Sequence, residues 1–429
     1  MSRFTFIHSA DIHLDSPMLN LDRYDGAPVE ECRSATRQAL ERMIELAIAE
    51  SVRFLLVAGD LFDGDCRDCN TPRFFRKKMA QLEEAGIDVF VVQGNHDAEN
   101  RMERAFRLQL PGNVHLFPTS GPETVELEDV GVAVHGQGFA DAAVTEDLSV
   151  GFPPSRAGCL NIGLLHTNVG GRAGHDNYAP SDLSTLVAKG YDYCALGHIH
   201  AGEFLREGDP WIVYPGVIQG RHVNESGPKG CVLVTVEDGR IVTAERIALD
   251  HVRWERCAVD AEPCGTAAAV LSAAIEAIAT ALEQAENRLL AVRVVVDGAS
   301  PAHGEIDLAP DAWIQELREH ALDRFQDRVW IERVVLNTRA ALDLEAALAE
   351  DNPLAEILKA LQRPEAIREA ISEIREELDA LLAGLPTDAR LSTAEGTGID
   401  LDDPEHLAAL ADDVQRLLIP RLLGGGGQP

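Results

Sequence analysis

Five groups of Asp, Asn and His residues stand out in the sequence, because each directly follows a short apolar run. Their carboxylate, amide and imidazole groups are ligands for divalent metal ions. Alternate residues that leave a strand project to the same side, so two donors spaced one residue apart can reach one ion. Together the groups supply enough donors for two ions. The motifs are Asp11-Ile-His13, Gly59-Asp60-Leu-Phe-Asp63, Gly94-Asn95-His96-Asp97, His166, and Gly197-His198-Ile-His200.

The apolar runs before these motifs predict the strands that position them. Between residue 1 and about residue 250, runs rich in Val, Ile and Leu alternate with helical patterns, which is typical of a layered α/β domain. Functional residues gather at the carboxyl ends of strands in such sheets. Lone histidines such as His115 and His135 are more often core or surface residues, and we interpret both in that way. The expected strands are 4–9, 54–58, 89–93, 131–135, 161–166, 193–196, 211–214 and 231–236. Two helices stand out, one over 34–49 and one that begins at Thr71-Pro72.

The pattern changes near Arg253, where further strands and helices predict a small second α/β domain. Beyond Leu342 the sequence becomes helical and charged. We therefore predict a first domain over 1–250, a second over 251–341 and a helical segment over 342–429. In the second domain the expected strands are 254–259, 291–296 and 328–336, and the expected helices are 265–286 and 310–325.

The chain is strongly acidic. It has 38 basic and 71 acidic residues, which gives a net charge of −33. Non-specific affinity for nucleic acid comes largely from Lys and Arg, so a polyanionic substrate would have to be met locally. Because the acidic excess runs through both halves of the chain, it favours good solubility over any particular partner.

Signals for targeting and disulfide bonding are weak. No signal peptide is apparent, and no apolar run approaches the roughly 20 residues that span a bilayer. We therefore expect a soluble, cytoplasmic protein without a membrane partner. The eight cysteines are sparse, which argues against a disulfide framework. Cys66 and Cys69 form a CxxC pair, but no second pair follows at zinc-ribbon spacing, which favours plain thiols.

The order of the motifs, DxH, GDxxD, GNHD, H and GHxH, resembles that of the calcineurin-like metallophosphoesterases at all five positions. Within that group the sequence is most similar to the SbcD family of bacterial DNA repair exonucleases, through residues 8–17, 57–63 and 214–222. The likeness covers about residues 1–250. It implies a β-sandwich flanked by helices, followed by a small α/β capping domain and a helical C-terminal segment.

The resemblance also implies a role for each motif residue. Asp60 would bridge two ions roughly 3.5–4 Å apart, which activate a water for in-line attack on phosphorus. His96 would face the scissile phosphate and stabilise developing charge or protonate the leaving oxygen. The mixed donors suit Mn²⁺ better than Fe, Zn or Mg²⁺. The implied ligands are Asp11, His13, Asp60 and His200 for one ion, and Asp60, Asn95, His166 and His198 for the other.

Three residues in or near the motifs are further candidates. Many related nucleases carry His where this chain has Asp63, which weakens the case for exonuclease activity in particular. We interpret Asp63 as a carboxylate that orients a ligand histidine. The glycine-rich stretch 170–178 predicts a loop over the metals, where Arg172 meets a phosphate or lies in a solvated connection. His222 is a candidate substrate contact, with an ordinary surface histidine as the alternative.

The leading interpretation is a DNA nuclease that degrades ends or hairpins and dimerises through its first domain. In the resembling family a C-terminal helical segment docks on an SMC-like ATPase of the SbcC type, and apolar stripes recur here over 367–381 and 407–418. Two alternatives stay open. One is a phosphoesterase for small or protein substrates, which the acidic surface favours. The other is a non-hydrolytic scaffold for the ATPase, against which the complete and costly ligand set argues.

Overall fold

The computed structural model describes residues 3–16, 26–63, 70–99, 110–171, 177–341 and 353–361, with single positions at 349, 363 and 373. The chain has a mixed α/β fold, as the alternating pattern predicts. It divides into two compact units, and all five motifs belong to the first. The first unit comprises Met1–Cys257, Ile278–Val294 and Ala321–Arg333, and the second comprises Ala258–Ala277, Val295–His320 and Val334–Pro429.

The first unit contains two six-stranded sheets. In the order β12-β11-β1-β2-β3-β4, strands β1 to β4 are parallel, β11 is antiparallel to β1, and β12 is antiparallel to β11. In the order β5-β6-β7-β8-β10-β9, the four central strands are parallel and the two edge strands are antiparallel. The bounds are β1 Arg3–Ser9, β2 Phe54–Ala58, β3 Asp88–Val92, β4 Val114–Leu116, β11 Gly230–Glu237, β12 Arg240–Ala248, β5 Glu123–Leu127, β6 Val132–Gln137, β7 Leu160–His166, β8 Tyr193–Gly197, β9 Glu203–Arg206 and β10 Trp211–Tyr214.

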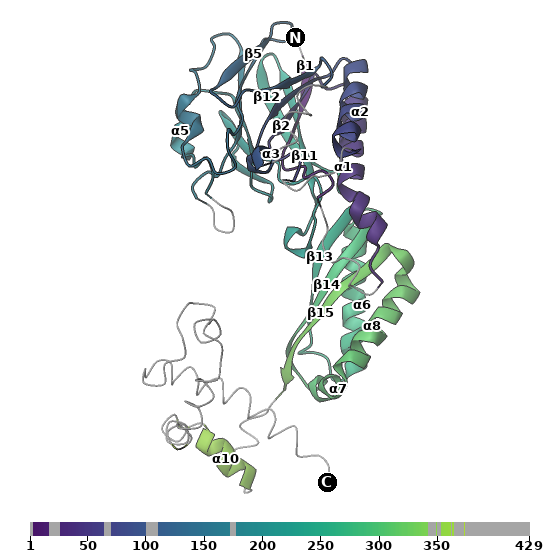
Figure 1. Ribbon diagram of the computed structural model, residues 1–429. Coiled ribbons are helices and arrows are strands. Elements are labelled where there is room, and N and C mark those ends of the chain that lie inside the picture. The colour runs from purple at the N-terminus through teal and green to yellow at the C-terminus, as the bar shows by residue number, and fades with distance from the viewer. Residues whose placement is uncertain are drawn as a thin grey trace. The chain divides into compact units, whose positions relative to one another are not determined.

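The core explains why the central strands are continuously apolar. Successive side chains point to opposite faces of a strand, and both faces of these strands are covered. In β2, Phe54 and Leu56 pack in the apolar cluster that joins the two sheets, whereas Leu55 packs toward α1 (Val29–Ala49) and α2 (Asn70–Glu84). Figure 1 shows these two helices beside each other next to the first sheet.

All eight strands predicted for residues 1–250 are present, with ends shifted by at most two residues. Four further strands were not predicted, and all four are sheet edges: β4, β5, β9 and β12. An edge strand is partly solvated and therefore carries polar side chains, as in the sequence of Arg240–Ala248, or is short, as in the three residues of β4. Helix α1 begins at Val29, five residues before the predicted start.

A third sheet has three strands in the order β13-β14-β15. The three strands and the two long helices predicted for this region are present, and a short helix, α7, was not predicted. Within the second unit, the indole of Trp313 donates a hydrogen bond to the carbonyl of Ala267 at 3.1 Å. The bounds are β13 Val252–Asp260, β14 Leu289–Ser300, β15 Val329–Ala340, α6 Ala267–Gln284, α7 His303–Leu308 and α8 Pro310–Phe325.

The described part of the C-terminal segment includes α10 (Pro353–Leu361). The apolar residues of the predicted stripes over 367–381 and 407–418 lie outside the described residues. The three-part division at residues 250 and 341 stays a prediction.

Helix α6 is, within the part of the chain that the structure describes, the one helix long and apolar enough to cross a membrane. This corrects the expectation that no apolar run approaches that length, because an alanine-rich helix reaches it with few large side chains. Val270, Ala274, Ile278 and Leu282 recur every fourth residue and are buried. Since buried helices of water-soluble proteins pass the same test, length and composition alone are weak evidence for a span.

Candidate metal centre

The five motifs follow β1, β2 and β3 in the first sheet and β7 and β8 in the second. In both sheets these strands are parallel, so their carboxyl ends lie at a common edge. Backbone hydrogen bonds then tie the loops together. The Asp11 N–H donates to the Gly59 carbonyl at 3.0 Å, and the Thr167 N–H donates to the Gly197 carbonyl at 3.1 Å. The loops therefore bring their side chains to one place.

The backbone at the motifs is strained. Asp11, His13, Asp60 and His198 have φ angles of 48°, 44°, 51° and 100°, values that cost a non-glycine residue of order 1–3 kcal/mol each. Such conformations persist only where neighbouring groups hold them. For example, both carboxylate oxygens of Asp11 accept a hydrogen bond from the His198 N–H, at 3.0 and 3.1 Å. Strain in four candidate ligands points to a site whose geometry matters for function.

Gly94 illustrates why glycine precedes several of the motif residues. A Cβ atom at this position would overlap the carboxylate of Asp60 and approach its backbone nitrogen to 2.8 Å. Gly59 meets a similar limit, because its Cβ would overlap the ring of His166. These glycines allow the loops to approach closely enough for donors from different strands to converge.

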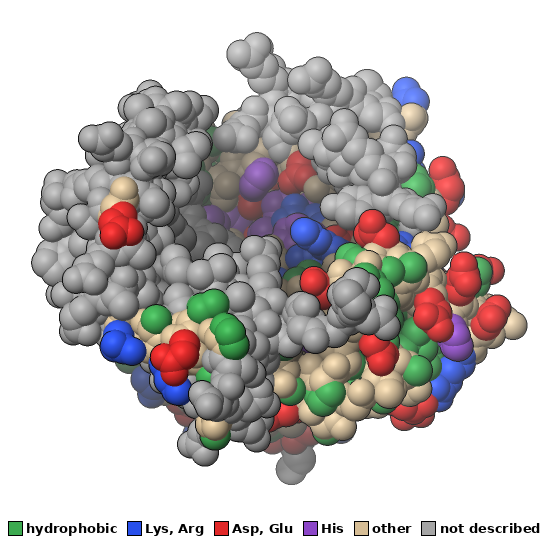
Figure 2. All heavy atoms as spheres, turned by 90° about the horizontal axis from the view of Figure 1, so that it is seen from below, with side chains coloured by type: hydrophobic (Ala, Val, Ile, Leu, Met, Phe, Trp, Pro, Cys, Tyr) green, Lys and Arg blue, Asp and Glu red, His purple; other side chains and the backbone are tan. Residues whose placement is uncertain are grey.

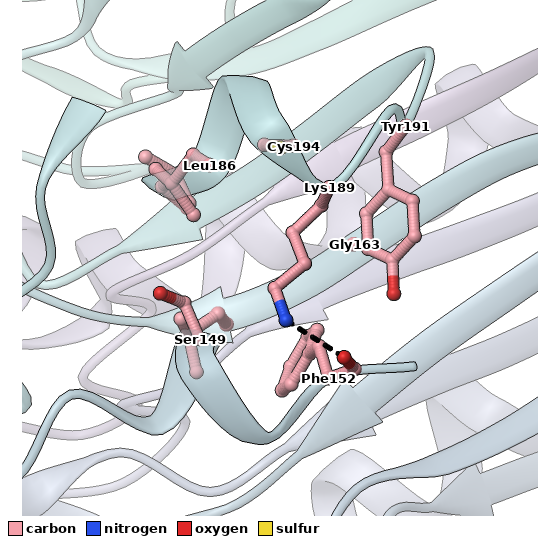
Figure 3. A pocket seen from close by; sticks show the side chains of 9 residues that line it. Ser149, Phe152, Gly163, Leu186, Lys189, Tyr191 and Cys194 are labelled. Carbon is pink, nitrogen blue, oxygen red and sulfur yellow. Dashed lines mark hydrogen bonds between the residues drawn. The ribbon is translucent and has the colours of Figure 1, made fainter. Parts of the chain in front are cut away.

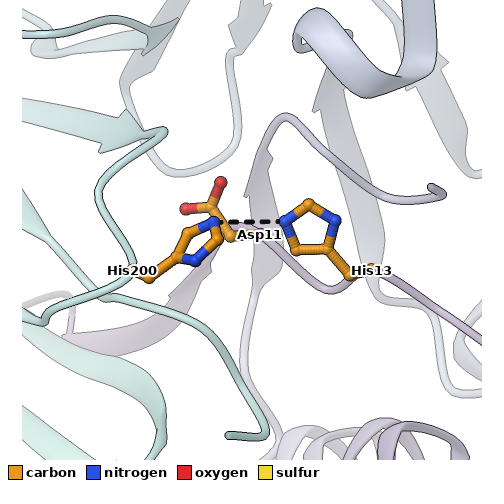
Figure 4. A group of neighbouring side chains, drawn as sticks. All are labelled: Asp11, His13 and His200. Atoms are coloured by element: carbon orange, nitrogen blue, oxygen red, sulfur yellow. Dashed lines mark hydrogen bonds between the residues drawn. The ribbon is translucent and has the colours of Figure 1, made fainter. Parts of the chain in front are cut away.

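The converging side chains form three groups whose donor atoms all lie within 4.8 Å of one another. Asp11, His13 and Asp60 each belong to two of the groups, so the groups overlap, and the bridging role of Asp60 stays a prediction. Figure 4 shows one group, in which a ring nitrogen of His13 and one of His200 point toward each other beside the Asp11 carboxylate. Figure 2 shows histidine, acidic and basic side chains close together on the face seen there. The groups are Asp11–His13–His200, His13–Asp60–His96 and Asp11–Asp60–His166.

Hydrogen bonds fix the tautomers of His13 and His200. The Nδ1 of His13 lies 2.6 Å from Asp63 Oδ1, and the Nδ1 of His200 lies 2.8 Å from Glu225 Oε1. An ionised carboxylate only accepts hydrogen bonds, so both Nδ1 atoms carry the proton and both Nε2 atoms hold a lone pair. These Nε2 atoms are 3.3 Å apart. Two lone pairs so close repel each other unless a cation lies between them, so the pair fits a shared metal ion.

His166 has the same arrangement. Its Nδ1 donates to the carbonyl of Ala58 at 2.9 Å, which leaves a lone pair on Nε2. That Nε2 lies 3.0 Å from Asn95 Oδ1 and 3.5 Å from Asp60 Oδ2, both of which are acceptors. Burial lowers the pKa of His166, and burial lowers the pKa of His13 to about 4, so both rings are neutral at pH 7. Neutral imidazoles are the form that binds metal.

The carboxyls of Asp11 and Asp60 are buried close together. Burial and the charge of Asp60 raise the pKa of Asp11 well above 3.8. Burial also disfavours the charged form of Asp60, but the nearby histidines His166, His13 and His96 outweigh it and lower its pKa. Two buried like charges are costly unless a cation compensates them. Together with the facing lone pairs, this shows that the donor set fits divalent metal ions.

Asp97 was not assigned a role from the sequence, although it belongs to the GNHD motif. Its carboxylate accepts hydrogen bonds from the N–H groups of Leu61, Phe62 and Gly94, at 3.0 to 3.1 Å. It therefore joins the loop after β2 to the loop after β3. Burial and the charge of Asp60 raise the pKa of Asp97 to about 7.

His96 lies at the entrance of the group. It is the second residue of α3 (Asn95–Glu99), its backbone N–H donates to Asp60 Oδ1 at 3.0 Å, and its side chain is 40% exposed. The Nδ1 of His96 is 3.6 Å from Asp63 Oδ1. A partly exposed imidazole beside the donors can contact a substrate, and it is also near enough to belong to one of the three donor groups.

The other predicted residues differ in how they are placed. The ring of His198 lies beside that of His166, with centroids 5.1 Å apart, but it belongs to none of the three donor groups found among the described residues. His222 is 56% exposed, with Nε2 3.9 Å from Glu225 Oε1. Arg172 lies outside the described residues.

The two histidines set aside in the sequence do not join the site. His135 is buried, stacks on Tyr191 with centroids 4.5 Å apart, and hydrogen-bonds Asn161 at 3.1 Å. His115 packs edge-on against Phe117. Both are accounted for by packing and hydrogen bonding.

Two residues near the donors, Arg221 and Glu225, were missed or only partly recognised. Neither Arg221, which precedes the predicted candidate His222, nor Glu225 is among the predicted site residues. Glu225 lies in a 3₁₀ turn, Val223–Glu225. Burial would raise the pKa of Glu225, but hydrogen bonds from His200 and Arg221 outweigh it and hold the pKa well below 4.5. The spacing of Arg221 and Glu225, four residues apart after a predicted strand, is the one signal that could have found them.

A small apolar pocket lies away from the donor groups, at residues that include Phe152, Leu186, Tyr191 and Cys194 (Figure 3). The one charged residue that lines it, Lys189, donates hydrogen bonds to the carbonyls of Val150 and Phe152, each at 2.8 Å. This pocket offers no converging polar groups for chemistry.

Comparison with known proteins agrees with this geometry. Residues 4–202 match the family described as calcineurin-like phosphoesterase, and residues 254–339 match the middle domain of metallophosphoesterase YhaO. The chain is 31% identical to "Uncharacterized metallophosphoesterase YhaO" of Bacillus subtilis, over 89% of this chain and 98% of that one. It is 26% identical to "DNA double-strand break repair protein Mre11" of Methanopyrus kandleri, over 80% and 75%. A subunit of the nuclease SbcCD of Bacillus subtilis is 23% identical over 58% and 71%.

The likeness to the YhaO protein extends across nearly the whole of both chains, and the family match covers the strands and loops that carry the metal-binding donors. The chain belongs to the calcineurin-like metallophosphoesterases, a family of metal-dependent hydrolases.

Proposed function

We propose that this protein is a two-metal phosphodiesterase that cleaves DNA. The observation that carries the proposal is the convergence of lone pairs: the Nε2 atoms of His13 and His200 face each other at 3.3 Å, and Nε2 of His166 faces the oxygen of Asn95 at 3.0 Å. The proposed ligands are Asp11, His13, Asp60 and His200 for one ion, and Asp60, Asn95, His166 and His198 for the other. The place of His198 rests on the family pattern.

When bound, a pair of divalent ions lowers the pKa of the attacking water and neutralises charge that develops on the phosphate. The chain's own residues do the rest. His96 donates a proton to the leaving oxygen or a hydrogen bond to the phosphate, since its ring is partly exposed and lies near Asp60 and Asp63. Asp97 keeps the two loops that carry Asp60 and Asn95 at a fixed separation.

Mn²⁺ is the ion we propose, because carboxylate, amide and imidazole donors together are of intermediate hardness. Fe, Zn and Mg²⁺ are the alternatives. Metal analysis of protein purified without added metal decides among them.

The choice of DNA as substrate is supported by the names of two relatives, one a DNA double-strand break repair protein and the other part of a nuclease. A second candidate, a phosphoesterase for small or protein substrates, is favoured by the net charge of −33. The rates of hydrolysis of duplex DNA, single-stranded DNA, a generic diester and a generic monoester in the presence of Mn²⁺ distinguish the two candidate functions. We expect DNA to be cleaved fastest, and a preference for either small substrate would rule out the nuclease.

An SMC-like ATPase of the SbcC type is the proposed partner, since one relative of this chain is named as part of SbcCD. We expect the C-terminal segment beyond residue 342 to bind it. Co-purification of the ATPase with the full chain, but not with a chain truncated near Leu342, would support this. Equal recovery with both chains would contradict it. We also propose a homodimer formed through residues 1–250, to be checked by light scattering.

A further inference from the structure

His13 and His200 each contact a carboxylate through Nδ1, the ring nitrogen that does not face the other histidine. The side chain of Arg221 lies near both carboxylates. Asp63 contacts His13 at 2.6 Å and Glu225 contacts His200 at 2.8 Å. The guanidinium of Arg221 donates to Glu225 Oε1 at 3.0 Å through Nη2, and its Nη1 is 3.8 Å from Asp63 Oδ1. Its own backbone N–H also donates to Glu225, at 2.7 Å. Arg221 therefore hydrogen-bonds Glu225 and lies within ion-pair distance of Asp63.

The segment that carries Arg221 is fixed by packing. Val223, two residues further on, is buried in a cluster that contains Cys32 of α1 and Trp254 of β13. Gly220 permits this close approach, because a Cβ there would contact the carbonyl oxygen of Glu225 at 2.6 Å. The arginine side chain is only 17% exposed and that of Glu225 only 6%. The geometry of the pair is thus set by the fold and not by solvent.

The contacts of Arg221 favour a positioning role over a phosphate contact. Its Nε and Nη2 point to Glu225, and its Nη1 is directed to Asp63. The Nδ1 of His200, 3.2 Å from Nη2, carries a proton and cannot accept from it. The planar guanidinium suits this task, because it can bind two carboxylates at fixed angles.

We propose that Arg221 is a positioning residue: it holds Asp63 and Glu225 so that His13 and His200 present Nε2 to the same metal ion. This inference rests on the proposed metal centre and adds to it two residues, Arg221 and Glu225, that no comparison assigns. Loss of Arg221 would leave every ligand in the chain, but Glu225 would lose the hydrogen bonds from the guanidinium and Asp63 would lose a nearby positive charge.

The test is the affinity for Mn²⁺ alone, measured by calorimetry without substrate on the full chain. We expect Arg221→Gln to bind Mn²⁺ at least about tenfold more weakly than wild type, the range found for partners of metal ligands. Arg221→Lys keeps the positive charge but not the planar guanidinium with its several donors. This variant should recover part of the lost affinity for Mn²⁺. Glu225→Gln should weaken binding similarly.

Arg53→Gln is the matched control. Arg53 also joins two carboxylates, Asp88 at 2.7 Å and Asp129 at 3.0 Å, but it lies at the start of β2, opposite the motif loops. The affinity of this variant for Mn²⁺ should stay within about twofold of wild type.

Wild-type affinity in folded Arg221→Gln would overturn the inference, as would an effect confined to the KM for substrate. If Arg221→Gln fails to fold, the affinities of Arg221→Lys and Glu225→Gln for Mn²⁺ test the inference instead. Wild-type affinity in both variants would overturn it. If the wild-type chain binds no Mn²⁺, the choice of Mn²⁺ is wrong and the same variants are compared with Zn²⁺. If it binds no divalent ion at all, the proposed function fails as well, which distinguishes the two.

Discussion

The carboxylate of Asp63 contacts two histidines with different proposed tasks: Oδ1 lies 2.6 Å from Nδ1 of His13 and 3.6 Å from Nδ1 of His96. Burial would raise the pKa of Asp63, but the hydrogen bond from His13 outweighs it, and the pKa lies well below 3.8. The carboxylate is therefore ionised at neutral pH and only accepts hydrogen bonds. This contact agrees with the interpretation of Asp63 as a group that orients a ligand.

Replacing this carboxylate with its amide tests that role. Asp63→Asn keeps the size of the side chain but presents donors as well as an acceptor to His13, so the tautomer of the ring is no longer fixed. We expect roughly 10- to 100-fold weaker metal binding, read as metal content after gel filtration. Asp129→Asn, at an exposed carboxylate paired with Arg53, is the control. Full metal content in Asp63→Asn would show that Asp63 does not position His13.

Gly94→Ala tests the close approach between the loops. The added Cβ would overlap the Asp60 carboxylate, so the loop must move, and overpacking of this kind costs about 1–3 kcal/mol. We expect a lower melting temperature and loss of bound metal. Gly265→Ala, where a Cβ meets nothing within 4 Å, should change neither. Retention of metal by Gly94→Ala would mean that the two loops need not approach so closely.

His8 predicts a dependence of stability on pH. The ring is fully buried against Tyr193, and burial lowers its pKa from 6.5 to about 3. Below pH 6.5 the unfolded chain binds a proton that the folded chain does not, so the free energy of unfolding falls as the pH falls. Between pH 6.5 and 5 the contribution of His8 is about 2 kcal/mol.

Urea unfolding of wild type and His8→Gln, with EDTA present, measures this contribution. The difference in free energy of unfolding between the two chains should change by that amount over this pH range, in the direction of lower relative wild-type stability at pH 5. A difference that does not vary with pH would mean that His8 is protonated in the folded chain.

The central strands could be predicted because they are buried on both faces and so are apolar at every position. Phe54–Ala58 is an example, with all five residues buried. The edge strands could not be predicted, because they are partly exposed to solvent and their sequences are therefore less apolar. Glu123–Leu127 has only exposed and half-buried positions and includes two glutamates, so its sequence pattern does not differ from that of a loop.

The candidate ligands could be predicted because donors at strand ends keep a fixed order along the chain. The residues that hydrogen-bond to these ligands, or to the loops that carry them, could not be predicted. Glu225 reaches His200 across 25 residues, and Asp97 reaches Leu61 across 36, by hydrogen bonds that depend on how the loops fold. Neither hydrogen bond can be predicted from the sequence, although Asp97 lies in the GNHD motif and Glu225 lies four residues after Arg221.

Cleavage of linear duplex DNA in the presence of Mn²⁺ tests the central claim most directly, with wild type, Asp60→Ala and His96→Ala compared and metal content measured in each. We predict that wild type cleaves and that EDTA stops it. Asp60→Ala should lose both metal and activity, and His96→Ala should keep its metal while cleaving roughly 10²- to 10⁴-fold more slowly. Absence of cleavage by metal-loaded wild type, or cleavage at the wild-type rate by both variants, would contradict the account.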